Sequence, residues 1–153
     1  LITCKTFNDI WLNEGFARYC QALWVEIIDG KQAYFNFMND HAYYGGGTIY
    51  VENPISNAAI FSSSLSYNKA SWVLHMLRNI VGDNMFFDLL RSYGSNDSLS
   101  YNAASTSDFQ NVCESVSGLD LHDFFNQWIY GQWYPKWSGF RLHQNGLGHS
   151  ANN

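Results

Sequence analysis

Apolar and polar side chains recur with a helical period along most of this chain. In the first such stretch, about residues 8–29, apolar side chains such as Leu12, Phe16 and Tyr19 return every three or four positions. Gly30 stands where a helix C-terminal cap belongs. This first stretch is therefore predicted to be one long helix.

The same period predicts five further helices and one long irregular segment. The helices are expected at about residues 31–43, 67–81, 83–93, 106–117 and 121–130. Residues 48–64 contain Pro54 and a run of serines, so a loop is expected there. Strand signals are weak throughout, and the sequence has no internal repeat. Together these elements predict an all-α domain of about six helices.

Helix N-termini are assigned from side chains that can accept a hydrogen bond from a free backbone N–H. The expected caps of the first, third, fourth and sixth helices are Asn8 or Asp9, Ser66, Asp83 and Asp120. The fifth helix is preceded by Ser105-Thr106-Ser107-Asp108, which has the order of a capping box. Gly118 is expected to end that helix.

Composition narrows the class of protein. The chain has 153 residues, of which 46% are hydrophobic and 18% aromatic, and this suits one domain with a sizeable core. Its net charge is -5 and it has no basic patch, so nucleic acid is not an expected partner. No apolar run reaches the roughly 18 residues of a membrane-spanning helix. The three cysteines include no C-x-x-C pair and predict neither a disulfide framework nor a metal site.

Taken by themselves, the residues that could carry chemistry give weak signals. Glu14 lies opposite the apolar stripe of the first helix, where carboxylates are usually solvated. Tyr67 stands at a helix start, where tyrosines more often pack than catalyse. The five histidines include no pair at the i, i+4 spacing that presents two imidazoles to zinc. His75 is expected on a helix surface or in a hydrogen-bonded core position.

A long literal motif adds a specific expectation. The run Trp11–Ala17 reads W-L-N-E-G-F-A and resembles the corresponding segment of the aminopeptidase N family of zinc peptidases, which are gluzincins. The resemblance implies that Glu14 is the third zinc ligand. In that family the other two ligands are the histidines of H-E-x-x-H, at a spacing that falls before Leu1 here. Both histidines and the general-base glutamate are therefore expected upstream of this chain.

A second segment resembles the same family at the right distance downstream. Residues 66–78 resemble the family's Y-x-K-G-A-x-V-L-H-M-L-R helix, whose tyrosine stabilises the oxyanion, and this implies that role for Tyr67. The chain departs from the family pattern at Ala70 and Ser71, where the family has Gly and Ala. Both changes are small and leave the phenol in place.

A third segment sets the extent of the resemblance. Residues 124–131, followed by Tyr134 and Pro135, resemble the end of the family's catalytic domain. The resemblance thus covers about residues 1–137, as the helical lobe of a thermolysin-like catalytic domain truncated on its N-terminal side. Residues 138–153 are expected to be a tail or the start of a following segment.

The resemblance implies a zinc-dependent aminopeptidase that acts on peptides. One Zn²⁺ would activate the attacking water and Tyr67 would stabilise the oxyanion. The implied partner is the α/β lobe that carries H-E-x-x-H, and Asn13 and Asp9 are candidates for orienting zinc ligands. With Glu14 as its single ligand, the chain alone is expected to be inactive. It is also expected to expose apolar surface and to associate with itself.

A second hypothesis from another class stays open at this point. The chain could be a non-catalytic helical binding module derived from the peptidase fold, with its aromatic surface serving as an interface. The codons just upstream distinguish the two hypotheses, because only the peptidase requires H-E-x-x-H there in frame.

Overall fold

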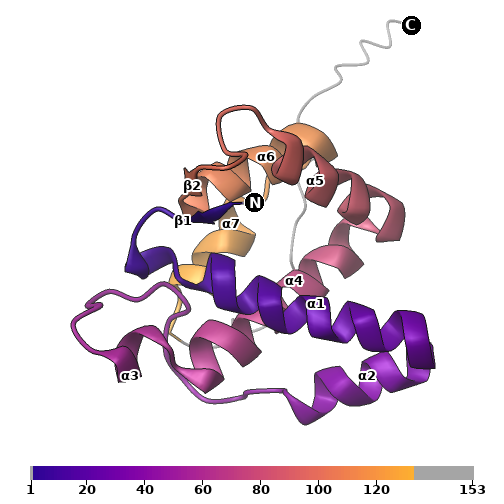
Figure 1. Ribbon diagram of the computed structural model, residues 1–153, viewed down its shortest axis with the longest axis horizontal. Helices are drawn as coiled ribbons and strands as arrows, with labels where there is room; N and C mark the ends of the chain where they lie inside the picture. The colour runs from indigo at the N-terminus through magenta and orange to yellow at the C-terminus, as the bar shows by residue number, and fades with distance from the viewer. Residues whose placement is uncertain (1, 133–153) are drawn as a thin grey trace, which may run out of the picture.

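The computed structural model describes residues 2–132, most of which are helical (Figure 1). The long helices are α1 (Trp11–Asp29), α2 (Lys31–Asp40), α4 (Ala70–Val81), α5 (Asp83–Ser95) and α6 (Thr106–Ser117). The short helical segments are the 3-10 turn η1 (Phe7–Asp9), α3 (Asn57–Ile60), α7 (His122–Phe125) and two π-helical segments, η2 (Ser63–Lys69) and η3 (Asn126–Tyr130). The prediction of an all-α fold is confirmed. The structure also contains two strands of two residues each, β1 (Thr3–Cys4) and β2 (Ala103–Ala104), which were not predicted.

The long helices enclose one apolar core. In Figure 1, α1 crosses the middle of the molecule, α2 folds back along it, and α5 and α6 lie together on the other side. The largest fully buried apolar side chains come from α1, α2, α4, α5, α6, α7 and the segment before α3; they include Trp11, Tyr19, Met38, Ile49, Leu74, Leu77, Phe86, Phe109, Phe124 and Phe125. Trp24 and Ile27, in the C-terminal half of α1, are exposed. One side of α1 is therefore packed and the other is open.

The start of the chain is tied to its later part. β1 pairs with β2 in parallel, with Thr3 opposite Ala103. Asp9 is buried and accepts hydrogen bonds from the backbone N–H of Thr106 at 3.0 Å and from its hydroxyl at 2.8 Å. The Trp11 indole N–H donates to the same hydroxyl at 2.8 Å. These bonds fix the first turn of α1 against the first turn of α6.

Helix boundaries follow the predictions with four differences. The second helix ends at Asp40, before the expected residue 43, and the expected loop at 48–64 contains α3. The third helix begins earlier, as the π-helical η2. The fourth helix, expected to end at residue 93, continues to Ser95, so Gly94 lies inside α5. A glycine within a helix costs only about 1 kcal/mol, which the packing of α5 on the core outweighs.

The capping predictions divide into two groups. The capping box is confirmed, because Ser105 Oγ accepts from the Asp108 N–H and the Asp108 carboxylate accepts from the Ser105 N–H. Gly118 ends α6 with a left-handed φ of 69°. Asp120 accepts from the N–H of His122, the first residue of α7, at 3.0 Å.

The other caps were predicted wrongly. Ser66 lies inside η2 and its hydroxyl donates to the Ile60 carbonyl, whereas Ser62 caps that segment. Asn8 and Asp9 do not cap α1: Asn8 donates to the Val51 carbonyl, and Asp9 binds the start of α6. Asp83 makes no cap hydrogen bond, because its carboxylate is held by Arg78. In each case another partner, either nearby or far along the chain, takes the side chain that local sequence favours as a cap. 

Two further points concern the chain as a whole. Within residues 2–132, none of the helices is both long enough and apolar enough to cross a bilayer. The expected tail at 138–153 and the last residues of the third motif lie outside the described residues.

Candidate active site

Glu14 stands in the first turn of α1, on the side that the core leaves open. Trp11, Leu12 and Gly15 around it are buried, whereas Glu14 itself is half-exposed. The residues of the motif thus divide into two sets: the apolar ones anchor the helix, and the carboxylate points away from the core. This is the position in which a helical carboxylate is available to a ligand.

Tyr67 lies in η2, the π-helical segment that leads directly into α4. Its side chain is half-exposed. Burial raises the pKa of the Tyr67 phenol, and the nearby Glu14 carboxylate raises it further, against an opposing effect of the Arg18 charge. The phenol therefore stays protonated at neutral pH. The structure places the two predicted site residues next to each other.

A close approach of two backbones explains why they meet. A Cβ at Gly15 would lie 2.6 Å from the Cβ of Ala70 and 3.5 Å from the Ser66 carbonyl oxygen. Only a glycine lets α1 come this near to η2 and the start of α4. Ala70, one of the two departures from the family pattern, therefore fits because Gly15 faces it.

The backbone of η2 is itself anchored on the side away from Glu14. Lys69 is 2% exposed, and its ammonium donates to the Gly47 carbonyl at 2.7 Å. Burial lowers the pKa of Lys69. The buried Ser66 hydroxyl donates to the Ile60 carbonyl at 2.8 Å. These bonds hold the π-helical turn, a conformation common at functional sites, in one place.

Two polar groups beside the pair were not singled out by the sequence. Arg18, one helical turn after Glu14, donates to Gln21 at 3.0 Å and contacts His41 Nε2 at 3.3 Å. Its Nε is buried and has no hydrogen-bond partner among the described residues, and the same holds for Oδ1 of Asn68. The i, i+4 spacing from Glu14 was the available signal for Arg18.

Asn13 and Asp9, the candidates for orienting zinc ligands, have other partners in the structure. Asn13 Oδ1 accepts from the Cys4 N–H at 2.8 Å, and its amide donates to the Thr3 hydroxyl at 3.1 Å. Asp9 binds Thr106. Both side chains therefore hold the chain around α1, and neither hydrogen bonds to Glu14 among the described residues.

A metal ion needs more donors than this region shows. Within residues 2–132, no three His, Cys, Asp or Glu side chains lie close enough together to hold a metal. Glu14 fits zinc in kind, since it offers carboxylate oxygens from a rigid helix. His75 does not join it, because its Nδ1 is hydrogen bonded to the Tyr34 hydroxyl at 2.5 Å. A helix surface and a hydrogen-bonded core position were both expected for His75, and the structure shows it half-buried and hydrogen bonded.

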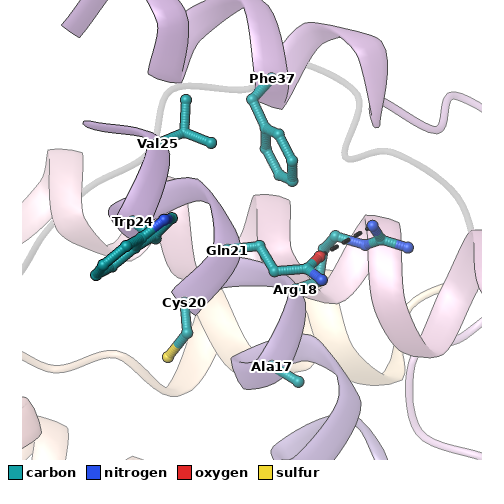
Figure 2. A pocket seen from close by; sticks show the side chains of 7 residues that line it. All are labelled: Ala17, Arg18, Cys20, Gln21, Trp24, Val25 and Phe37. Carbon is teal, nitrogen blue, oxygen red and sulfur yellow. Dashed lines mark hydrogen bonds between the residues drawn. The ribbon is translucent and has the colours of Figure 1, made fainter. Parts of the chain in front are cut away.

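An open hollow of about 540 Å³ follows α1 beyond Glu14. It is lined by Ala17, Arg18, Cys20, Gln21, Trp24, Val25 and Phe37. In Figure 2, Phe37 of α2 lies across the hollow from Gln21, and the Arg18 guanidinium lies on the side away from Trp24. The open side of α1 is thus mostly apolar, with one cation near its Glu14 end.

Comparison with known proteins matches this arrangement to one family. The model of the peptidase family M1 domain matches residues 1–128. The chain belongs to peptidase family M1. This confirms the resemblance to the aminopeptidase N gluzincins that the three motifs carry.

Curated members of the M1 family match nearly the whole chain. Aminopeptidase N of Lactococcus lactis is 29% identical over 147 residues, which cover 88% of this chain and 17% of that protein. Aminopeptidase M1-B of Oryza sativa is 31% identical over 157 residues, covering 94% of this chain and 18% of that protein. The chain therefore spans less than a fifth of the length of these relatives.

A solved M1 structure supports the fold. An M1 zinc metallopeptidase variant from Deinococcus radiodurans, bound to a Tyr-Ser-Ala substrate, superposes with a TM-score of 0.73 at 25% identity. The match covers 88% of this chain and 30% of that one. The helical architecture described above is thus a part of an M1 peptidase fold.

Proposed function

We propose that this M1 chain supplies one wall of a zinc aminopeptidase active site, with Glu14 as a zinc ligand and Tyr67 as the oxyanion donor. The observation that carries the proposal is the packing of α1 on η2, where the close approach of Gly15 to Ala70 and Ser66 brings together the turns that carry Glu14 and Tyr67. Two separate motifs, on α1 and η2, predicted these residues independently. A fold that merely conserved helix packing would have no need to place them side by side.

Glu14 would hold the metal together with donors from outside the described residues. A catalytic zinc takes three protein ligands and keeps one position open, and it supplies an activated water and a Lewis acid. Glu14 can serve as one ligand because the buried motif residues around it fix the helix while its carboxylate stays accessible. The two histidines of H-E-x-x-H are the proposed companions.

Tyr67 would act as a hydrogen-bond donor to developing negative charge. Its phenol is protonated at neutral pH, because burial and the neighbouring carboxylate raise its pKa. A donor held toward an oxyanion in this way typically lowers the barrier by about 3 kcal/mol. The anchoring of η2 through Lys69 and Ser66 keeps the donor in place without reorganisation.

The proposed substrate is a peptide with a free N-terminus. The relatives named above are aminopeptidases, and the Deinococcus structure holds a Tyr-Ser-Ala substrate. The proposed partner is the α/β lobe, which would pack on the open side of α1. Without that lobe, the chain is proposed to be inactive.

Calorimetric titration of the 153-residue chain with zinc tests the ligand set. The expected result is binding weaker than micromolar, because one carboxylate cannot hold zinc tightly. Sub-micromolar binding would reveal ligands within this chain and contradict the proposed division between two lobes.

The catalytic role is tested in a longer product of the same gene that includes the upstream coding region. We expect an in-frame H-E-x-x-H there, one bound zinc per molecule and hydrolysis of amino-acid anilides. The Glu14→Gln variant should lose the zinc. Glu52→Gln, at an exposed carboxylate before α3, is the control and should keep it. Full zinc content in the Glu14→Gln protein would remove Glu14 from the site.

A further inference from the structure

The core of this protein contains a chain of hydrogen-bonded polar side chains that the proposed chemistry does not use. The hydroxyls of Tyr19 on α1 and Tyr34 on α2 lie 3.2 Å apart. Tyr34 in turn contacts Nδ1 of His75 on α4 at 2.5 Å. Tyr19 and Tyr34 are buried, and His75 is half-buried. We call these three residues the tyrosine–histidine chain.

The side chain of Arg78 lies beside the tyrosine–histidine chain. The Arg78 guanidinium donates to Glu26 on α1 at 2.7 and 3.2 Å and to Asp83 on α5 at 2.9 Å through two of its nitrogens. Its carbon lies 5.5 Å from the centre of the Tyr34 ring. Four helices, α1, α2, α4 and α5, therefore meet in one polar cluster.

The contacts between α1 and the η2–α4 segment occur in the same order along both. Gly15 meets Ala70, Tyr19 reaches His75 through Tyr34, and Glu26 meets Arg78. The two elements therefore run parallel to each other, and Glu14 and Tyr67 stand just before the contact between Gly15 and Ala70. Beyond the Gly15 contact, the tyrosine–histidine chain is the next link that sets how the two helices lie along each other.

Buried polar side chains are a costly way to pack helices. Apolar residues of the same volume usually stabilise a core as well or better, because polar groups must be desolvated. Hydrogen bonds, however, have fixed lengths and directions, so a satisfied network defines one arrangement where apolar contacts permit sliding. The hydrogen bonds that join α1, α2 and α4 can therefore fix the register of α1 against α4, and the relative placement of Glu14 and Tyr67 depends on that register.

We propose that the tyrosine–histidine chain is a positioning device, which sets the register of α1 against α4 and so holds Glu14 and Tyr67 at their working separation. The role of that separation in catalysis rests on the proposed function. The positioning itself does not, since it concerns two side chains of this chain and needs no zinc.

Nuclear Overhauser effects between the Tyr67 ring and the Glu14 methylenes measure the separation in the 153-residue chain. Tyr34→Phe removes the central hydroxyl of the tyrosine–histidine chain and keeps the ring. We expect these cross-peaks to lose at least half of their intensity in that variant. Tyr93→Phe is the matched control, because Tyr93 is also buried but lies on α5 outside the cluster. It should keep the cross-peaks even where its melting temperature falls.

Wild-type cross-peak intensity in folded Tyr34→Phe would overturn the proposal. If that variant does not fold, Tyr19→Phe removes only the terminal hydroxyl and the same comparison applies. In the zinc-loaded longer protein, Tyr34→Phe should lower kcat roughly tenfold to a hundredfold with little change in KM, since small misplacements cost this much. If Tyr34→Phe weakens the cross-peaks but leaves kcat unchanged, the positioning proposal stands. The proposed role of Glu14 and Tyr67 in catalysis is then contradicted.

Discussion

The Cβ of Ala70 lies only 2.6 Å from the point that a Cβ on Gly15 would occupy. Gly15 lies within α1, and Ala70 is the first residue of α4, directly after the π-helical segment that carries Tyr67. A Cβ at Gly15 would therefore force one of the two backbones to shift.

Gly15→Ala should therefore destabilise the protein, although alanine normally favours a helix. Overpacking of this kind costs about 2 kcal/mol. Urea unfolding monitored by circular dichroism gives the measurement. The double variant Gly15→Ala/Ala70→Gly exchanges the two side chains and should recover most of the loss. A single variant as stable as wild type would mean that the helices separate at no cost.

Removal of the Tyr67 hydroxyl should separate catalysis from metal binding. In the zinc-loaded longer protein, Tyr67→Phe is expected to lower kcat about a hundredfold, as for other oxyanion donors, while zinc content stays at one per molecule. Steady-state kinetics and metal analysis are the two measurements. A variant with unchanged kcat would exclude Tyr67 from the reaction.

Stability should fall as the pH drops below about 6.5, the ordinary value for histidine. Burial lowers the pKa of His75, and the charge of Arg78 lowers it further, against the effect of Glu26. The unfolded chain then binds a proton that the folded chain does not, so the free energy of unfolding decreases as pH falls toward the folded pKa, by at most about 1.4 kcal/mol per pH unit.

Urea titrations between pH 7.5 and 4.5 measure this slope, and His75→Gln should flatten it. The lowered pKa values of Asp83 and Asp108 concern a more acidic range, because their ordinary value is 3.8. A slope that is the same in the variant would assign the effect to another group.

Asp9 should contribute more to the free energy of unfolding than a surface carboxylate does. It is buried and binds both the N–H and the hydroxyl of Thr106, so Asp9→Ala leaves the start of α6 without its acceptor. A loss of about 2 kcal/mol is expected in thermal or urea unfolding. Asp9→Asn keeps one acceptor oxygen and should cost less. Equal losses for both variants would point to the charge instead of the cap.

The open side of α1 should cause self-association of the isolated chain. Trp24, Ile27 and Ile28 are 65%, 75% and 60% exposed and form an apolar patch. Light scattering over a range of concentrations should show a rising apparent mass. Replacing Trp24 and Ile28 by serine should restore a monomer. A wild-type chain that stays monomeric at millimolar concentration would contradict this expectation.

Periodicity was sufficient to predict the long helices, because each buries an apolar stripe of ordinary spacing. It could not predict the use of polar side chains whose partners lie far along the chain. Asp9 looks like a local cap and binds Thr106 instead, and Ser66 looks like a helix start and lies inside a π-helical segment. Local sequence does not contain the information that selects such partners.

The candidate site also combines residues that the sequence predicted with residues that it did not. Glu14 and Tyr67 followed from motifs, and the structure then placed them together. Arg18 carries no motif signal, and only its i, i+4 spacing from Glu14 on α1 indicated that it lies beside the pair. The hydrogen bonds of the tyrosine–histidine chain could not be predicted either, because Tyr19 and Tyr34 occupy ordinary apolar positions of two separate predicted helices.

The hydrogen bonds between Asp9 and Thr106 join positions 97 residues apart. Closing so large a loop costs more entropy than forming the contacts inside α1–α2 or α5–α6, so we expect these bonds to form after the helices between them have collapsed. The first turn of α1, which carries Glu14, gains its native partners in this same late step. On this expectation, the position of Glu14, the proposed zinc ligand, is set at the end of folding, and a nascent chain cannot present it before α6 has been made.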